Sequence, residues 1–344
     1  MVQEIQKKIV KYFLIILGLI LLIYLTFTID FISILKHIKE ISFSTYLLLS
    51  SLLILTICFK AAKWNFIVKK TFNINLSFLS SIKDNFAGIA SSIITPGRAD
   101  LAKSLLLYQK HNVSLSKSIS IGILDRIVEF LAVLIIMLIS LLFTNKEFLK
   151  EIRFLILLVI IITFIACSFL LFFSKPAENI IKNIKEKFTN KKILTKILNL
   201  FEKITQGFAI FYKKPIAFIK LLTLALLWIS CGILIFHFTF LSFGLNIPFQ
   251  TTALAMTSSL IIAVLSFIPG GIGITETSFL AILSLTHIKT IESSGLIVAS
   301  IVIARIFSLY LPAIIGTIIL IKNSTKNSTK KLHNKDNINS KNNK

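Results

Sequence analysis

An uncharged stretch of 20 residues at 154–173, FLILLVIIITFIACSFLLFF, constrains the fold of this chain more than any other feature. At about 1.5 Å per residue, a helix of that length crosses the ~30 Å hydrocarbon core of a bilayer. Similar apolar stretches suggest about six full spans, at 12–29, 45–63, 118–143, 154–173, 216–243 and 295–321. With 55% hydrophobic residues and a mean hydropathy of +0.86, the sequence predicts an all-α polytopic membrane protein.

The basic residues fit a membrane topology better than a nucleic-acid site. The formal net charge is +23, and Lys and Arg concentrate in four segments, 1–11, 60–117, 174–215 and 322–344. Cytoplasmic segments of membrane proteins carry such an excess. We therefore expect a plasma-membrane protein with both termini cytoplasmic and with no nucleic-acid partner.

This charge pattern also suggests the domain organisation. Residues 1–321 should form one integral membrane domain, followed by a disordered, basic cytoplasmic tail at 322–344. The insert at 174–215 alternates lysines with apolar residues at helical spacing. Such a segment either lies on the membrane surface or packs as a solvated connector under the bundle.

Two further apolar regions, 76–112 and 249–288, are broken in the middle. The first contains Pro96-Gly97 and the second contains Pro269-Gly270-Gly271. Neither half of either region reaches the ~20 residues that a span needs. Non-helical backbone at membrane depth is tolerated only where protein or a water-filled cavity covers it. We therefore expect two re-entrant hairpins of broken helices.

The two broken regions continue in the same way. Each break is followed by a carboxylate, Asp100 or Glu276, and then by an arginine inside a span, Arg126 or Arg305. The charge pattern makes the preceding spans run in opposite directions, which predicts inverted repeats at about 45–143 and 216–321. Paired interrupted helices of this kind point to a transporter-type site near the midplane. Chance similarity of two Pro-Gly breaks is the alternative.

The residues at the breaks suit an anionic headgroup. Glycines let a ligand approach free N–H groups at the start of the following half-helix, and Arg98 could grip a phosphate in bidentate fashion. The alternatives are a kink that allows close helix packing and carboxylates that only cap N–H groups. The candidate ligand-binding residues are Pro96, Gly97, Arg98, Asp100, Asp125, Arg126, Glu129, Pro269, Gly270, Gly271, Gly273, Glu276 and Arg305.

The buried charges need partners because each costs about 2.5–3.5 kcal/mol near the bilayer centre. Asp125, Arg126 and Glu129 lie on one side of their helix and sum to −1, so another cation is required, for which Arg98 is plausible. Arg305 has no carboxylate within one turn, and Glu276 is its expected partner. These pairs either line a polar ligand cavity or only lock the bundle.

No pattern of catalysis or metal binding stands out. The sequence has no P-loop, GxSxG, HExxH or CxxC, and its three cysteines are scattered through apolar segments. We expect no catalytic residue, no metal and no cofactor. Transport would then be facilitated, or driven by an ion gradient.

Four motifs carry a family resemblance: PGRADLAKS at 96–104, DRIVE at 125–129, PGGIGITE at 269–276 and ARIFSLYLP at 304–312. Over residues 8–321 the chain resembles the lysylphosphatidylglycerol synthase transmembrane-region family, flippase-like proteins of the UPF0104 type. That family has Gly-Glu where this chain has Ala99-Asp100, and Glu-Arg with a later Asp where it has Asp125-Arg126 and Glu129. Charges thus match better than residue types.

The resemblance implies lipid translocation, because these proteins are related to the membrane part of the bacterial multiple peptide resistance factor. Only a short tail follows the last span here, so we expect no synthesis of lysyl-lipid. Our first hypothesis is a flippase that binds an anionic phospholipid or polyprenyl-phosphate headgroup near the midplane. The alternatives are a membrane-embedded transferase with Asp100, Asp125 or Glu276 as base, and an accessory subunit of a separate synthase or glycosyltransferase.

Overall fold

A computed structural model describes residues 41–95, 100–111, 113–144, 214–285 and 294–323, with a few helical positions between 154 and 161. All regular secondary structure in these ranges is helical, which confirms the predicted class. The described helices long and apolar enough to cross a membrane are α3 (Phe43–Phe72), α6 (Leu115–Phe143), α10 (Pro215–Ser242) and Gly295–Asn323. They match four of the six predicted spans. The other two, 12–29 and 154–173, fall wholly or mostly outside the described residues.

Helix α3 is longer than its apolar stretch predicted. It begins after Ser42, whose hydroxyl accepts from the N–H of Thr45 at 3.3 Å, and it ends at Asn73 in the left-handed region. The helix thus continues past the predicted end at residue 63, and Lys69 and Lys70 in its last turn favour the negative end of the helix dipole. The extension keeps Lys60 and Lys63 inside a regular helix, surrounded by apolar neighbours.

Each broken region forms two short helices, as predicted. The first gives α4 (Phe78–Ile94, 17 residues) and α5 (Leu101–His111, 11 residues). The second gives α11 (Phe249–Leu265, 17 residues) and α12 (Ile274–Leu285, 12 residues), with a 3₁₀ turn, η2 (Pro269–Gly271), between them. None of the four helices reaches the length of a full span.

The remaining long helix changes geometry part-way. It starts as α13 (Ser294–Arg305) and continues as a π-helical turn, η3 (Ile306–Tyr310), before returning to α-helix. Single π turns inside α-helices are rare and often lie at functional sites. No local sequence pattern predicts this turn, which directly follows Arg305.

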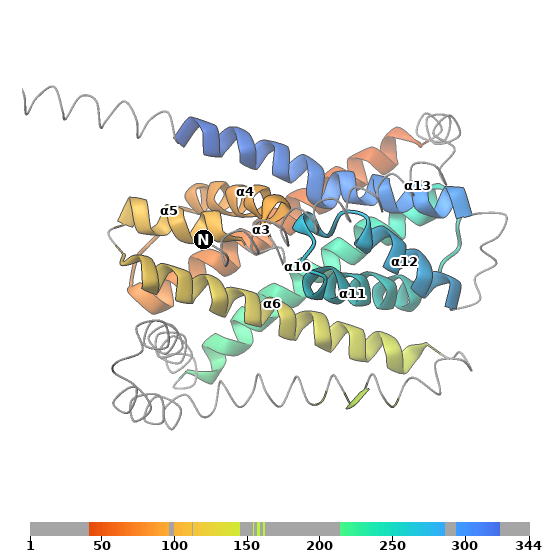
Figure 1. The fold of residues 1–344 in the computed structure, drawn as a ribbon, viewed down its shortest axis with the longest axis horizontal. Coiled ribbons are helices and arrows are strands. Elements are labelled where there is room, and N and C mark those ends of the chain that lie inside the picture. Colours follow the sequence, from red (N-terminus) through yellow and green to blue (C-terminus); the bar gives the residue numbers. More distant parts are fainter. Residues whose placement is uncertain are drawn as a thin grey trace, which may run out of the picture.

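The helices are arranged around a central pair (Figure 1). Helices α3 and α10 pack extensively on each other, and hairpins α4–α5 and α11–α12 lie on opposite sides of their crossing. Helix α6 borders one edge of this arrangement, and the helix Gly295–Asn323 borders the opposite edge. Each half therefore consists of a long helix, two short helices and a second long helix. Their inverted orientation in a bilayer remains a prediction.

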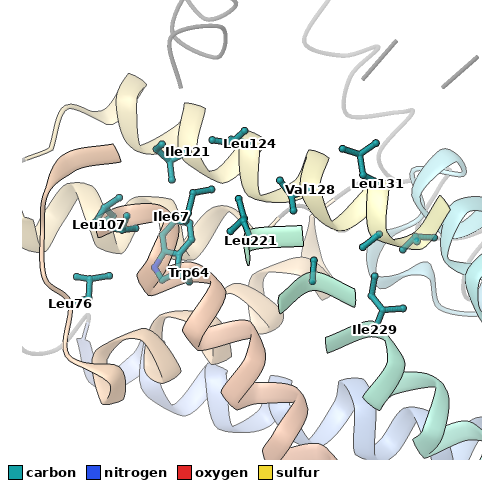
Figure 2. Close-up of a cluster of buried hydrophobic side chains, with 14 of the residues drawn as sticks. Trp64, Ile67, Leu76, Leu107, Ile121, Leu124, Val128, Leu131, Leu221 and Ile229 are labelled. Carbon is teal, nitrogen blue, oxygen red and sulfur yellow. The ribbon is translucent and has the colours of Figure 1, made fainter. Parts of the chain in front are cut away.

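Apolar side chains from several helices form the core beside α6 (Figure 2). Ile121, Leu124, Val128 and Leu131 lie on one face of α6 and meet Trp64 and Ile67 of α3 and Leu221 and Ile229 of α10. The 3- and 4-residue spacing on α6 produces this face. The charged residues of α6 at 125, 126 and 129 lie outside this apolar face.

Two glycines allow backbones to meet at the hairpins. A Cβ at Gly316 would overlap the carbonyl oxygen of Phe86, so the last long helix packs directly on α4. A Cβ at Gly270 would lie 3.3 Å from the Cα and carbonyl oxygen of Ile93, near the end of α4. The second break therefore touches the helix that leads into the first break.

Candidate functional site

Seven charged side chains from the first half meet between α3, α5 and α6. We call them the first-half charge cluster. Its members are Lys60, Lys63, Asp100, Lys103, Asp125, Arg126 and Glu129. Asp100 directly precedes α5, and all members except Arg126 are buried. One turn separates the members on each helix, which directs their side chains to the same place.

The inner part of the cluster is organised by Lys63. Its Nζ lies 2.9 Å from Oδ1 of Asp125 and also bonds Oε1 of Glu129. Lys103 bonds the other oxygen of Asp125. Lys63 on α3, Lys103 on α5 and Asp125 on α6 are each 0% exposed to solvent. Such ions persist only because each charge has close partners.

The outer part of the cluster is organised by Asp100. Its Oδ2 lies 3.3 Å from Nζ of both Lys60 and Lys103, and it pairs with the guanidinium of Arg126. Arg126 also lies 2.8 Å from Oε2 of Glu129. The Arg126 side chain is 33% exposed, and its Nε has no hydrogen-bond partner. Oδ1 of Asp100 is likewise buried without a partner.

Both tryptophans of the chain face this cluster. The Nζ atoms of Lys60 and Lys63 lie 4.7 and 5.4 Å from the ring centroid of Trp228 on α10. The Nζ of Lys103 lies 4.9 Å from the ring of Trp64. Cations over an indole face are attracted by its quadrupole, and the attraction strengthens when they are desolvated.

The cluster corrects one inference from the charge pattern. Lys60, Lys63 and Lys103 lie within the basic segment 60–117, which we had interpreted as cytoplasmic, whereas the structure buries all three. They supply partners for Asp125 and Glu129. Arg98, the partner that the sequence suggested, lies outside the described residues. The signal was present: Lys60 and Lys63 stand one turn apart within apolar neighbours, and Lys103 stands one turn after Asp100. Among the residues that the structure describes, the cluster holds four cations and three carboxylates, a formal excess of one positive charge.

The second break forms a separate centre, the Arg305 centre, made of Gly270, Gly271, Gly273, Glu276 and Arg305. The three glycines have φ values of 66°, 61° and 82°, which confirms that the break needs residues without a Cβ. Pro269 opens the turn η2 that carries the first two of them. These positive φ values turn the carbonyl groups of the break toward Arg305.

Arg305 is almost fully buried and is held from several directions. It pairs with Oε1 of Glu276, as predicted, and donates to the carbonyl oxygen of Gly270 at 3.0 Å. The carbonyl oxygen of Gly271 lies 3.5 Å from it. The guanidinium carbon also lies 5.4 Å from the ring centroid of Tyr310, at the end of the π turn. A planar group with five donors suits this mixture of carbonyl and carboxylate acceptors.

The N–H groups of this break are less open than the sequence suggested. The N–H of Gly273 donates to Oε2 of Glu276 at 2.9 Å, and that of Gly271 donates to the carbonyl of Ile268 at 3.0 Å. Glu276 therefore both caps α12 and pairs with Arg305. We had expected an open cradle of N–H groups, but the carboxylate of the chain itself fills part of it.

The structure thus places the candidate residues in two groups. Asp100, Asp125, Arg126 and Glu129 meet in the first-half charge cluster. Pro269, Gly270, Gly271, Gly273, Glu276 and Arg305 lie at the second break. Pro96, Gly97 and Arg98 lie outside the described residues. One more buried acid, Asp84 on α4, pairs with Lys110 of α5 at 3.0 Å, apart from both groups.

Comparisons with known proteins agree with this architecture. The sequence profile of the family described as "Lysylphosphatidylglycerol synthase TM region" matches residues 13–316. The chain belongs to this family. It is 27% identical over 331 residues to "UPF0104 membrane protein PH1989" of Pyrococcus horikoshii, covering 91% of this chain and 97% of the relative. It is 25% identical over 240 residues to "UPF0104 membrane protein MJ1078" of Methanocaldococcus jannaschii, covering 66% and 91%.

Family membership confirms the resemblance given by the four motifs, and it makes the protein an integral membrane protein. The matched range, 13–316, contains both groups of candidate residues. The geometry of the two centres is therefore part of the family domain rather than of a segment added to it.

Proposed function

We propose that the protein binds the phosphate of a membrane lipid headgroup at the first-half charge cluster and moves that lipid between leaflets. The observation that carries the proposal is the excess of one positive charge among four cations and three carboxylates in a buried site. A net charge in low dielectric is costly and favours a counter-ion of opposite sign. A lipid phosphate supplies one.

Arg126 is the residue best placed to contact such a ligand. It is the one member of the first-half charge cluster with substantial exposure, 33%, and its Nε has no partner. A guanidinium can bind a phosphate through two parallel N–H groups, which gives both energy and orientation. The buried lysines would act by setting the charge of the site, and the bound lipid would leave its acyl chains in the bilayer.

Reconstitution tests the proposal. Purified protein in vesicles with fluorescent phospholipids or polyprenyl phosphates should exchange at least one of these lipids between leaflets faster than protein-free vesicles do. Arg126→Gln should slow the exchange about 10- to 100-fold, because a hydrogen bond to a charged group contributes about 1.5–3 kcal/mol. Lys110→Gln is the matched control, since Lys110 pairs with Asp84 away from the cluster.

Two results would contradict the proposal. If no lipid class exchanges faster than in protein-free vesicles, the protein does not transport these lipids. Equal slowing by Arg126→Gln and Lys110→Gln would remove the cluster as its site. Mass spectrometry of the extracted lipid belongs to the same experiment, because a covalently altered lipid would instead indicate a membrane-embedded transferase.

A further inference from the structure

Asp100 occupies the place in the first-half charge cluster where cations converge most strongly. Lys60, Lys103 and Arg126 all form ion pairs with the same oxygen, Oδ2, whereas no ion pair of the described residues involves Oδ1, which is also buried. A carboxylate that receives three cations on one oxygen occupies the position of an anion bound in a basic site. A phosphate oxygen would meet the same donors, with Nε of Arg126 still free to add a bond.

The three carboxylates of the cluster differ in how freely they could leave. Asp125 and Glu129 lie within α6, a helix of 29 residues, so the helix fixes their backbone and each carboxylate can move only by rotation of its side chain. Asp100 precedes the first residue of α5, in a non-helical position at the end of the break. Rotation of a few backbone dihedrals there would displace its side chain at small cost. Asp100 is thus the carboxylate best able to move.

The second half shows a contrasting arrangement of the same elements. Glu276 also follows a break and also pairs with an arginine, but its other oxygen accepts from the N–H of Gly273 at 2.9 Å. Arg305 is 2% exposed and donates to the carbonyl of Gly270 as well. Glu276 is therefore fixed by two bonds of different kinds, whereas Asp100 is held by charge alone among the contacts described. The first-half charge cluster is therefore the site where a carboxylate can be exchanged for another anion.

We propose that Asp100 is an internal anion, which occupies the phosphate position of the first-half charge cluster until a lipid phosphate displaces it. This inference rests on the proposed function. Binding frees the Asp100 carboxylate from its three cations. A Cβ at Gly88 of α4 would lie 3.3 Å from Cβ of Asp100, so α4 packs tightly on this residue.

Intrinsic fluorescence offers a direct readout, because the chain has two tryptophans and both face cluster lysines. The full chain in detergent would be titrated with a short-chain phosphodiester lipid and, in a second arm, with inorganic phosphate. Asp100→Asn should raise the affinity for phosphate about tenfold or more, since a ligand competing with an internal occupant binds only the minor, open fraction. If the lipid saturates the fluorescence change at a lower concentration, the ligand is a lipid headgroup. If inorganic phosphate does so, the ligand is the free ion.

Asp125→Asn is the matched control for charge. It changes the net charge of the cluster by the same amount but removes a carboxylate that cannot leave, so its effect should be clearly smaller. Asp84→Asn, outside the cluster, should leave affinity unchanged. Should Asp125→Asn fail to fold, Glu129→Gln replaces it: this variant also removes a carboxylate carried by α6, so its gain in affinity should likewise be smaller than that of Asp100→Asn.

The outcomes separate the two proposals. A larger gain for Asp100→Asn than for Asp125→Asn, or than for Glu129→Gln, supports displacement. Equal gains for Asp100→Asn and Asp125→Asn, or no gain for Asp100→Asn, overturn it, although phosphate binding that depends on Arg126 would still uphold the proposed function. Absence of binding in every variant, Asp100→Asn included, removes both.

Discussion

Arg305 shows how a single buried residue can fix a broken helix. Its guanidinium donates to the carbonyl of Gly270 and pairs with Glu276, which in turn accepts from the N–H of Gly273. Carbonyls that a helix would have bonded are thereby satisfied by a side chain. The π turn that starts at Ile306 follows at once, so the distortion of one helix and the break of another share this contact.

Replacement of Arg305 should therefore act mainly on stability. Arg305→Leu leaves Glu276 buried without its cation, and removal of one partner of a buried pair costs about 3–5 kcal/mol. Adding Glu276→Gln should recover part of this loss, because a neutral amide oxygen can still accept from Gly273. Thermal unfolding midpoints in detergent would measure both effects. A double variant no more stable than Arg305→Leu would show that the carbonyl contacts, rather than the ion pair, hold the break.

Lipid exchange by the same double variant tests whether Arg305 also binds a ligand. If Arg305 only holds the bundle together, the double variant should regain lipid exchange along with its midpoint. The contacts described here favour that result, in contrast to the phosphate-binding role suggested by the sequence. If the unfolding midpoint recovers but lipid exchange does not, Arg305 takes part in binding the ligand.

At the residue scale, the sequence predicted interactions whose partners stood out as isolated charges. Glu276 and Arg305 were the only such residues in their apolar surroundings, and their pairing is confirmed. Lys60, Lys63 and Lys103 could not be assigned in the same way, because basic residues near a helix end ordinarily indicate a cytoplasmic segment. Their one-turn spacing was a local signal, but the carboxylates that they meet depend on how α3, α5 and α6 pack together.

Among the elements, the turn η2 depends on glycine for space as well as for conformation. Gly271 has a φ of 61°, and a Cβ there would come within 2.7 Å of both Ala263 and Thr275. Gly244 has a φ of 71° but nothing within 4 Å of its position. Gly244→Ala should thus cost only the left-handed strain, about 1–2 kcal/mol. Gly271→Ala should cost about 1–3 kcal/mol more, through overpacking.

The two alanine variants can be compared in one unfolding series in detergent. Because both positions carry the same backbone penalty, the difference between their midpoints reports the packing of the break alone. Equal midpoints would mean that Thr275 and Ala263 move aside freely, and that the break is softer than its contacts indicate.

The packing of the last long helix on α4 gives a second test at this scale. Gly316→Ala would drive a methyl group into the carbonyl of Phe86 and should destabilise the protein by about 1–3 kcal/mol. Gly295→Ala, in the same helix but with open space around it, should be neutral or stabilise by up to about 1 kcal/mol. A neutral Gly316→Ala, again from thermal midpoints, would contradict this contact between the halves.

Element by element, the apolar stretches predicted helix positions well and helix ends less well. Breaks at Pro-Gly pairs were predictable because these residues disrupt helices for local reasons. The extension of α3 from 63 to 72 was not, because polar residues there remain helical while packed on other helices. The π turn at 306–310 was equally hidden, since its sequence, IFSLY, is ordinary for a helix.

For the whole molecule, the two centres are joined where Gly270 of the second break touches Ile93 at the end of α4. The first-half charge cluster carries the exposed arginine and the excess charge, whereas the Arg305 centre is neutral and closed. In the proposed transport, such an asymmetry would let the first half exchange its ligand while the second half keeps the crossing of α3 and α10 rigid. This assignment requires that the halves have opposite orientations in the bilayer.

Orientation can be tested with single cysteines and a membrane-impermeant thiol reagent. The native Cys58, Cys167 and Cys231 would first be replaced by serine or alanine. Basic segments stay on the cytoplasmic side, so segment 174–215 and the tail from 322 should be protected in intact cells. The connections around 145 and 290 carry few basic residues and should face outside.

We therefore expect Asn145→Cys and Thr290→Cys to react in intact cells, whereas Asn190→Cys and Ser328→Cys should react only after the membrane is permeabilised. Positions 145 and 190 flank the predicted span at 154–173, and reaction at opposite faces would also establish that this stretch crosses the bilayer. Labelling of position 190 in intact cells would put α10 in the same direction as α3. The inverted-repeat interpretation would then fail. The assignment of ligand exchange to the first half and of a rigid supporting role to the second half would fail with it.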